Sequence, residues 1–206
     1  MTAARFIVFE GGEGAGKSTQ SRALADYLEA RGHRVRRTRE PGGTPAAEAI
    51  RAVLLDPAHT GLDDRAEALL FAAARGDHAA RVIRPALAEG DIVISDRYID
   101  SSVAYQGVAR DLGADRVADL SLWATGGLLP DLTIVLDVDP SVGLARVVGP
   151  DRLESEPVEW HQRVRRAFLD IAAAQPDRYL VLDGSRPVED LAVEIATVVS
   201  DLVGDP

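Results

Sequence analysis

The segment Gly11–Ser18, with the sequence GGEGAGKS, constrains the fold of this chain more than any other stretch. It fits G-x-x-x-x-G-K-[ST] without a mismatch, a pattern typical of loops that bind phosphate groups. Its glycines let the backbone curl until successive N–H groups point inward, and the following helix adds the positive end of its dipole. We predict that a nucleoside triphosphate is held by Gly11, Gly12, Glu13, Gly14, Ala15, Gly16, Lys17, Ser18 and Thr19.

The residues on either side of this loop support the interpretation. Residues 5–9 form a short apolar run typical of a β-strand, and residues 19–31 have helical spacing of apolar positions. Lys17 is expected to reach the outer phosphates, and the Ser18 hydroxyl to bind Mg²⁺. The alternative, a glycine-rich turn that only joins a strand to a helix, is disfavoured because lysine, hydroxyl and flanking pattern agree.

The rest of the chain alternates between strand and helix patterns. Strands are expected at residues 33–38, 91–96, 132–137 and 178–182, and helices at 45–55, from 63 to about 90, 101–106, 114–123, 140–147, 157–174 and 188–203. Such alternation predicts right-handed crossovers and a parallel sheet covered by helices. We predict an α/β P-loop NTPase fold, a five-stranded parallel sheet flanked by helices on both faces, in a single domain over residues 1–206. The second strand is placed at a sheet edge because only Val35 is strongly apolar.

Charge and composition narrow the possible functions. The formal net charge is −10, which argues against general nucleic-acid binding. There are no cysteines, so disulfides and cysteine metal sites are excluded. The first strand begins close to the N-terminus and no apolar run is long enough to span a membrane, so we expect neither signal peptide nor membrane partner, and a cytoplasmic location.

Four predicted strands end in a carboxylate: Glu10, Asp96, Asp137 and Asp183. In open α/β sheets the ligand crevice lies beyond the carboxyl ends of the strands, although helix caps or turns would explain the same pattern. Asp96 is expected to bind Mg²⁺ with Ser18 and to act in catalysis. The guanidinium of Arg97 can bind a phosphate through two parallel hydrogen bonds. A structural Asp–Arg pair is the alternative.

Several ordered segments together resemble the thymidylate kinases of bacteria, within the P-loop nucleoside monophosphate kinases. These segments are FEGGEGAGKST at 9–19, TREPGGT at 38–44, LFAAAR at 70–75, DRY at 96–98 with SSVAYQG at 101–107, PDLT at 130–133 and DRLE at 151–154. The resemblance runs in order over nearly the whole chain. It implies phosphorylation of dTMP to dTDP by ATP with Mg²⁺, in the synthesis of DNA precursors, by a homodimer.

The resemblance also implies substrate-binding roles. Phe71 would stack on the thymine ring and Arg75 would reach its exocyclic oxygen or the 5′-phosphate. The acceptor phosphate, sugar and base edge would be contacted by Arg39, Arg97, Glu13, Ser102 and Gln106. Tyr105 would occupy the space that a 2′-hydroxyl needs. Taken singly, Phe71 and Tyr105 would be interpreted as core residues and Arg75 as a solvated charge.

The segment at about 146–155 corresponds to the family's lid. Some members carry an arginine within the phosphate loop, but here those positions are Gly12, Glu13, Gly14 and Ala15. In similar bacterial members the lid supplies the catalytic arginine, so the resemblance implies a lid arginine here, and the segment offers Arg146 and Arg152. We favour Arg152, and the alternative for it is a salt bridge to Asp151 or Glu154.

Two other functions remain open at this point. The first is a kinase for a different acceptor, although Arg39, Arg75 and Arg97 favour a charged one. The second is a switch or regulatory module that uses ATP to bind a partner, which would have no need of Phe71 and Arg75.

Overall fold

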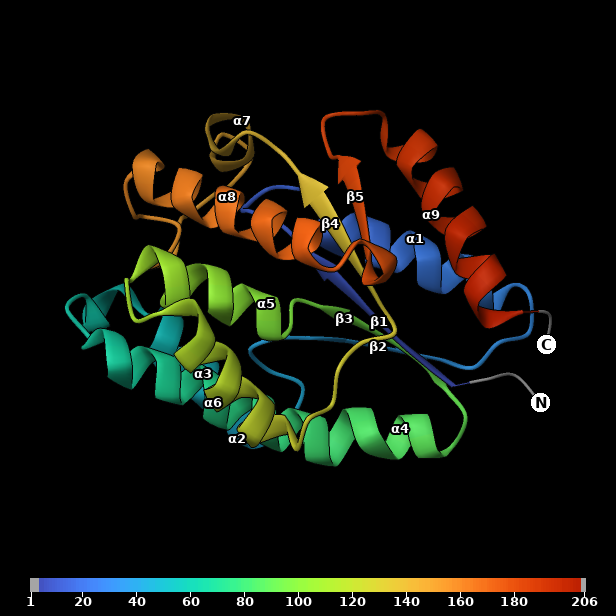
Figure 1. The fold of residues 1–206 in the computed structure, drawn as a ribbon, viewed down its shortest axis with the longest axis horizontal. Helices are drawn as coiled ribbons and strands as arrows, with labels where there is room; N and C mark the ends of the chain where they lie inside the picture. Colours follow the sequence, from blue (N-terminus) through green and yellow to red (C-terminus); the bar gives the residue numbers. More distant parts are fainter. Residues whose placement is uncertain (1–3, 205–206) are drawn as a thin grey trace.

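The computed structural model describes residues 4–204 and contains one parallel sheet of five strands, as predicted. The strands are β1 (Arg5–Glu10), β2 (Val35–Arg39), β3 (Ile92–Asp96), β4 (Leu132–Asp137) and β5 (Tyr179–Asp183). Their order across the sheet is β2-β3-β1-β4-β5, so the arginine-rich β2 lies at an edge and β1 at the centre. The crossovers place helices on both faces of the sheet (Figure 1).

Nine α-helices surround the sheet within the described residues. They are α1 (Lys17–Glu29), α2 (Pro45–Leu55), α3 (Asp64–His78), α4 (Arg84–Ala88), α5 (Ile99–Ser102), α6 (Ala114–Thr125), α7 (Pro140–Leu144), α8 (Val158–Ala174) and α9 (Val188–Val203). Short 3₁₀ turns occur at Pro57–His59 and Pro176–Arg178. In Figure 1, α1 and α9 lie together on one side of the sheet, and α5, α3, α6 and α8 lie on the other.

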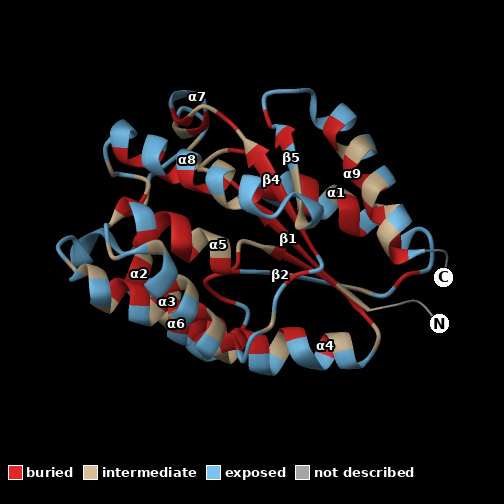
Figure 2. Ribbon diagram, in the orientation of Figure 1, coloured by how far each residue is buried: buried red, intermediate tan, exposed pale blue. Residues whose placement is uncertain are grey.

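The core follows from the alternation of side chains along the central strands. Ile7 and Phe9 of β1 pack with residues of α1 and α9, whereas Phe6 and Val8 face the opposite layer. A strand covered on both faces is apolar at consecutive positions, which explains the run FIVF. Figure 2 shows β1 and β4 buried along most of their length, with exposure concentrated on the outer faces of the helices.

The helical stretch expected from residue 63 to about 90 is divided into α3, a π-helical segment and α4. α3 continues through Gly76, where a Cβ atom would lie 3.0 Å from the carbonyl oxygen of Ala124 in α6. Gly76 therefore allows α3 and α6 to pack closely and does not interrupt α3. The change of path comes at the π-helical segment Ala79–Ile83, and Pro85 then stands in the first turn of α4, where its missing N–H costs no hydrogen bond. A second π-helical segment, Val103–Ala109, extends α5.

The carboxyl ends of the strands form one edge of the sheet. Glu10, Asp96, Asp137 and Asp183 are each the last residue of a strand, as predicted. Phe9 of β1 pairs in register with Asp96 of β3, so the phosphate loop leaves the sheet beside this aspartate. Within residues 4–204 no helix combines the length and the apolar character that crossing a membrane requires.

Candidate active site

The phosphate loop is held against the sheet by contacts that leave room only for glycine. At Gly11, φ is +134° and a Cβ atom would lie 2.4 Å from the carbonyl oxygen of Leu136 in β4. Lys17, in the first turn of α1, donates to the carbonyl oxygens of Gly11 at 3.0 Å and Gly12 at 2.6 Å. Burial lowers the pKa of its ammonium group, and the nearby charge of Arg97 lowers it further. The loop thus encloses a cation that a phosphate group can recruit.

Ser18 and Asp96 meet beside this loop. The Ser18 hydroxyl donates to Asp96 Oδ2 at 2.5 Å, which joins the start of α1 to the end of β3. These are hard oxygen donors, the type that Mg²⁺ prefers. Among residues 4–204 there is no group of three or more His, Asp or Glu side chains that could hold a metal ion. A metal at this pair would therefore complete its shell with water and phosphate oxygens, as Mg²⁺ commonly does.

Arg97 connects the phosphate loop with a neighbouring cavity. Its Nη2 donates to Glu13 Oε1 at 2.8 Å, and its Nη1 to the Gly11 carbonyl oxygen at 3.2 Å and the Ser101 hydroxyl at 3.1 Å. The Tyr105 hydroxyl also donates to Glu13 Oε1, at 2.6 Å. Burial acts to raise the pKa of Glu13, but the charges of Arg97 and Lys17 and the Tyr105 hydrogen bond lower it to about 2.

A buried carboxylate supports the turn that carries Arg97. Arg97 has φ of +71°, a left-handed conformation that costs energy in a residue other than glycine. Glu10, with no exposed surface, accepts from the Tyr98 N–H at 2.8 Å, the Ser101 N–H at 3.1 Å and the Ser101 hydroxyl at 2.6 Å. Burial, and next the charge of Asp100, raise the pKa of Glu10 to about 7. These contacts fix the direction of the Arg97 side chain.

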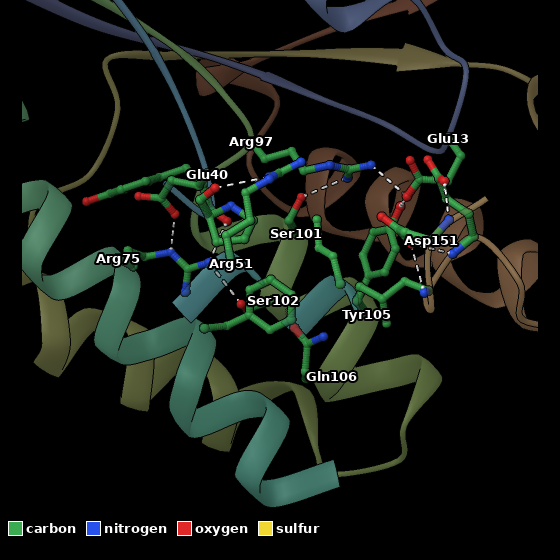
Figure 3. Close-up of a pocket in the computed structure, with 16 residues that line it drawn as sticks. Glu13, Glu40, Arg51, Arg75, Arg97, Ser101, Ser102, Tyr105, Gln106 and Asp151 are labelled. Carbon is green, nitrogen blue, oxygen red and sulfur yellow. Dashed lines mark hydrogen bonds and ion pairs between the residues drawn. The ribbon is translucent and has the colours of Figure 1, made fainter. Parts of the chain in front are cut away.

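The cavity beside Arg97 has a volume of about 110 Å³. Figure 3 shows its lining, with Arg97 and Glu13 at one end and Gln106 at the other. Seven residues predicted to bind substrate line it together: Glu13, Phe71, Arg75, Arg97, Ser102, Tyr105 and Gln106. The other lining residues are Glu40, Pro41, Arg51, Leu55, Tyr98, Ser101, Asp151, Leu153 and Glu154.

Arg75 is held by four hydrogen bonds inside the protein. Its Nε donates to Glu40 at 2.8 Å, its Nη1 to Ser121 at 3.1 Å, and its Nη2 to the Tyr98 carbonyl oxygen at 3.1 Å and the Ser102 hydroxyl at 2.9 Å. A guanidinium has five N–H groups, so one remains for a ligand. Among residues 4–204, Arg75 therefore has a fixed position in the cavity lining and one N–H group without a partner.

Aromatic side chains shape the middle of the cavity. Phe71, on α3, is 8% exposed, and its remaining surface faces the cavity. Tyr105 packs edge-on against Trp160 and Phe168, with ring centroids 5.4 and 6.2 Å apart. Arg97 lies over the Tyr105 ring at 5.0 Å from its centroid. Tyr105 thus combines the expected core packing with a hydroxyl that is hydrogen-bonded to Glu13.

Arg39 is not brought to this cavity. It forms an ion pair with Glu48 at 2.8 Å and lines a separate hollow with Ser18 and Asp96. Arg51 of α2 lines the cavity instead and donates to the Pro41 carbonyl oxygen at 3.0 Å. Our sequence reasoning missed Arg51. The available signal was that it is the only basic residue of α2.

Arg152, our choice for the lid arginine, does not reach the phosphate loop. It is 7% exposed, its Nε donates to the Leu54 carbonyl oxygen at 2.9 Å, and its Nη2 lies 2.7 Å from Glu67 Oε2 as an ion pair without hydrogen-bond alignment. The favoured role is therefore not supported, and its ion-pair partner is neither Asp151 nor Glu154. Arg146, the other candidate, donates to the Gly14 carbonyl oxygen of the loop at 3.0 Å.

The helix α7, which precedes the lid, rests on the phosphate loop backbone to backbone. A Cβ atom on Gly14 would lie 2.1 Å from the Gly143 carbonyl oxygen, and one on Gly143 would lie 2.1 Å from the Glu13 carbonyl oxygen. No side chain fits between these two segments. This contact holds the start of the lid, including Arg146, at the loop.

Comparison with known proteins gives consistent matches over the chain. The family model described as thymidylate kinase matches residues 9–195. A thymidylate kinase of Symbiobacterium thermophilum is 52% identical over 200 residues, covering 96% of this chain and 94% of that protein. One of Deinococcus radiodurans is 48% identical over 204 residues, covering 98% of each. The crystal structure of thymidylate kinase from Ehrlichia chaffeensis superposes with a TM-score of 0.80 at 36% identity, covering 96% of this chain and 99% of that one.

Proposed function

The chain belongs to the thymidylate kinase family, and from this membership we propose how its residues carry out the family's reaction. That reaction transfers a phosphoryl group from ATP to dTMP and yields dTDP for nucleotide biosynthesis. A phosphate oxygen of dTMP attacks the γ-phosphorus of ATP, the bond from that phosphorus to the β,γ-bridging oxygen breaks, and ADP leaves. Because the nucleophile is already an anion, catalysis consists mainly of positioning and charge neutralisation.

The cavity beside Arg97 is the proposed dTMP site. One observation carries this assignment: an aromatic ring, Phe71, and two guanidinium groups, Arg97 and Arg51, line one cavity that reaches the phosphate loop at Glu13. The thymine ring would stack on Phe71, and the phosphate would lie near Arg97 and Arg51. Bidentate binding by arginine suits a phosphate that must be held in line with a donor. Arg51 thereby takes the position that we expected for Arg39.

Other cavity residues would contact the base and sugar. Arg75 would offer its one remaining N–H, and Ser102 and Gln106, which line the same cavity, would face the base. Tyr105 would lie against the deoxyribose, with its hydroxyl kept on Glu13. In this arrangement Glu13 neutralises Arg97 before substrate binds, so the dTMP phosphate competes with Glu13 for that cation.

The phosphate loop is the proposed ATP site. Backbone N–H groups from Gly11 to Thr19 would surround the phosphates. Lys17 would move its ammonium from the Gly11 and Gly12 carbonyl oxygens to the outer phosphates. Arg146, already at the loop, would neutralise charge on the transferring phosphoryl group.

Magnesium fits the oxygen donors at the loop. Ser18 and Asp96 would hold it, since their side-chain oxygens lie 2.5 Å apart at the edge of the loop. When bound, Mg²⁺ supplies positive charge that offsets the negative charge of the phosphates.

Measurement of ADP release tests this function against its alternatives. We expect ADP to form rapidly from ATP only when dTMP is present, with thymidine, dAMP and dGMP giving little. Fast release with a different acceptor would assign another substrate. Release that no acceptor accelerates would favour a switch or regulatory module. Phe71→Ala would raise the KM for dTMP while leaving ATP affinity unchanged.

We also propose a homodimer and a cytoplasmic location. Leu69 on α3 and Trp123 on α6, which are neighbouring helices, are 57% and 83% exposed, and burial of such apolar surface stabilises association. Trp123→Arg should then shift the sedimentation coefficient from dimer to monomer. A cytoplasmic location agrees with the supply of ATP and dTMP there, and cell fractionation tests it.

A further inference from the structure

A fully buried carboxylate, Glu67, lies behind the proposed base-binding end of the cavity. Its exposed fraction is 0%, and it lies on α3, one turn before Phe71. Its Oε1 accepts a hydrogen bond from Gln106 Nε2 at 2.8 Å. Arg152 Nη2 lies 2.7 Å from its Oε2, and Arg110 Nη2 lies 3.4 Å from the same oxygen. Glu67 therefore contacts one amide and two guanidinium groups.

This arrangement determines which way the Gln106 amide faces. A carboxylate held by two guanidinium groups can only accept hydrogen bonds, so only the NH₂ end of an amide can face it. The carbonyl oxygen Oε1 of Gln106 then points the other way. Gln106 lines the cavity, and within the described chain no hydrogen bond is donated to its Oε1. The cavity is thus given a fixed hydrogen-bond acceptor at the end remote from Glu13 (Figure 3).

We propose that Glu67 is a positioning residue that sets base specificity by holding Gln106 with its acceptor toward the base. Thymine and uracil carry a donor at N3, whereas cytosine carries a lone pair there. A fixed acceptor pairs with the first two and is left facing a lone pair in the third, and a site built to hydrogen-bond a group strongly rejects an analogue that lacks it. This inference rests on the proposed function, which places the base between Phe71 and Gln106.

A purely structural role for Glu67 makes a different prediction. Glu67 also neutralises Arg110 and Arg152, so its loss would disturb packing. Asp64 provides a matched control, since its carboxylate lies 3.4 Å from Arg110 Nε, whereas the Gln106 amide donates to Glu67. Removal of the negative charge of Glu67 or of Asp64 takes away an ion-pair partner of Arg110, but only the change at Glu67 releases the Gln106 amide.

The test compares dUMP with dCMP as acceptors for E67Q, D64N and the unaltered enzyme. These two acceptors share sugar and phosphate and both lack the methyl group, so their ratio of kcat/KM reports base pairing alone. We expect E67Q to lower the dUMP/dCMP ratio by about tenfold or more, because the substituted amide can donate or accept and Gln106 becomes free to turn. D64N should leave the ratio unchanged. An unchanged ratio in E67Q, or an equal fall in both variants, would overturn the proposal.

A second variant keeps the test decisive if E67Q does not fold. Q106L removes the oriented amide and leaves both guanidinium contacts of Glu67 in place, so it should lower the same ratio to a similar extent. The double variant should show no further loss, because both changes remove one interaction. A ratio in Q106L equal to that of the unaltered enzyme would overturn the proposal. Failure of the proposed function would be visible separately, as absence of dTMP-dependent ADP release by the unaltered enzyme.

Discussion

Arg97 Nη2 lies 2.8 Å from Glu13 Oε1, so the proposed phosphate-binding cation of the acceptor site is joined to the phosphate loop of the donor site. Both side chains are largely buried, with 17% and 14% of their surface exposed. Water therefore screens this pair less than it screens a surface ion pair. A dTMP phosphate that binds Arg97 must loosen its contact with Glu13, which links occupation of one site to the geometry of the other.

Arg97→Ala should weaken dTMP binding far more than thymidine binding. A charge-assisted contact to a phosphate contributes about 1.5–3 kcal/mol, and thymidine has no phosphate to lose it. Arg39→Ala is the control and should change dTMP affinity little, since Arg39 pairs with Glu48 outside the cavity. Isothermal titration with both ligands measures the difference. Equal losses for dTMP and thymidine in Arg97→Ala would reject the assigned role.

Lys17→Ala should abolish phosphoryl transfer while leaving dTMP affinity nearly unchanged. The ammonium group lies among loop carbonyl oxygens and addresses only the donor phosphates. Titration calorimetry with dTMP and a coupled assay for ADP measure the two properties separately. Near-normal turnover of the variant would contradict the assignment of the loop.

Tyr105→Ala should narrow the preference for dTMP over its ribonucleotide counterpart. The ring is proposed to occupy the space of a 2′-hydroxyl, and its removal admits that group. Tyr105→Phe keeps the ring and loses only the hydrogen bond to Glu13, so its preference should remain. The ratio of kcat/KM for dTMP to kcat/KM for the ribonucleotide, measured for each variant, tests this prediction. A preference that both variants retain would exclude steric rejection by this ring.

Substitution of the two lid arginines should affect different properties, the catalytic rate in one case and the stability in the other. Arg146→Ala should lower kcat by on the order of 10³-fold, because an arginine that neutralises the transferring phosphoryl group contributes about that much. Arg152→Ala should instead lower the unfolding free energy by about 3 kcal/mol, since it leaves Glu67 without one of its buried ion-pair partners. Rapid-quench kinetics and urea unfolding of both variants test this. A slow chemical step in Arg152→Ala with normal stability would restore our first choice.

Glu10 should make stability depend on pH. Burial raises the pKa of this carboxyl from its ordinary value of 4.5 to about 7 in the folded protein. Its ionisation therefore costs stability fully above pH 7, and that cost disappears as the pH falls toward 4.5. Glu10→Gln removes this titration. The unfolding free energy of the variant minus that of the unaltered protein should therefore decrease as the pH is lowered from 8 to 5, by a few kcal/mol at most. Urea unfolding of both proteins at the two pH values measures this difference. A difference that is the same at pH 8 and pH 5 would contradict the prediction.

Local sequence signals predicted the parts of the site that adjacent residues determine. The loop from Gly11 to Ser18 depends on glycines and a lysine that are contiguous, and the strand-end position of Asp96 follows from the apolar run before it. Edge placement of β2 also followed from composition, because a strand with one strongly apolar residue cannot be covered on both faces.

Side-chain directions could not be predicted in the same way, because their partners are remote in sequence. Arg152 and Arg146 are both arginines of one short segment. Arg152 is held away from the loop by Glu67 of α3 and the Leu54 carbonyl oxygen of α2, which are both remote in sequence. Likewise, Arg39 forms an ion pair with Glu48 outside the cavity, and Arg51 is the arginine of this region that lines it. The positive φ of Arg97 could not be predicted either, because the turn that contains it is supported by Glu10, a buried hydrogen-bond acceptor at the end of another strand.

The contact between Gly14 and Gly143 has a consequence for the conformational entropy of docking α7 on the phosphate loop. An interface made by side chains must freeze their rotamers each time it forms, at a cost of up to about 2 kcal/mol for a long side chain. Here peptide groups meet directly, with a Cβ atom excluded on either side. Docking of α7 on the loop therefore carries no rotamer entropy at these two positions, and the hydrogen bond from Arg146 to the Gly14 carbonyl oxygen adds to this backbone contact. The contact between these two segments therefore requires no side chain to be ordered at either glycine, and any side chain added there would separate them.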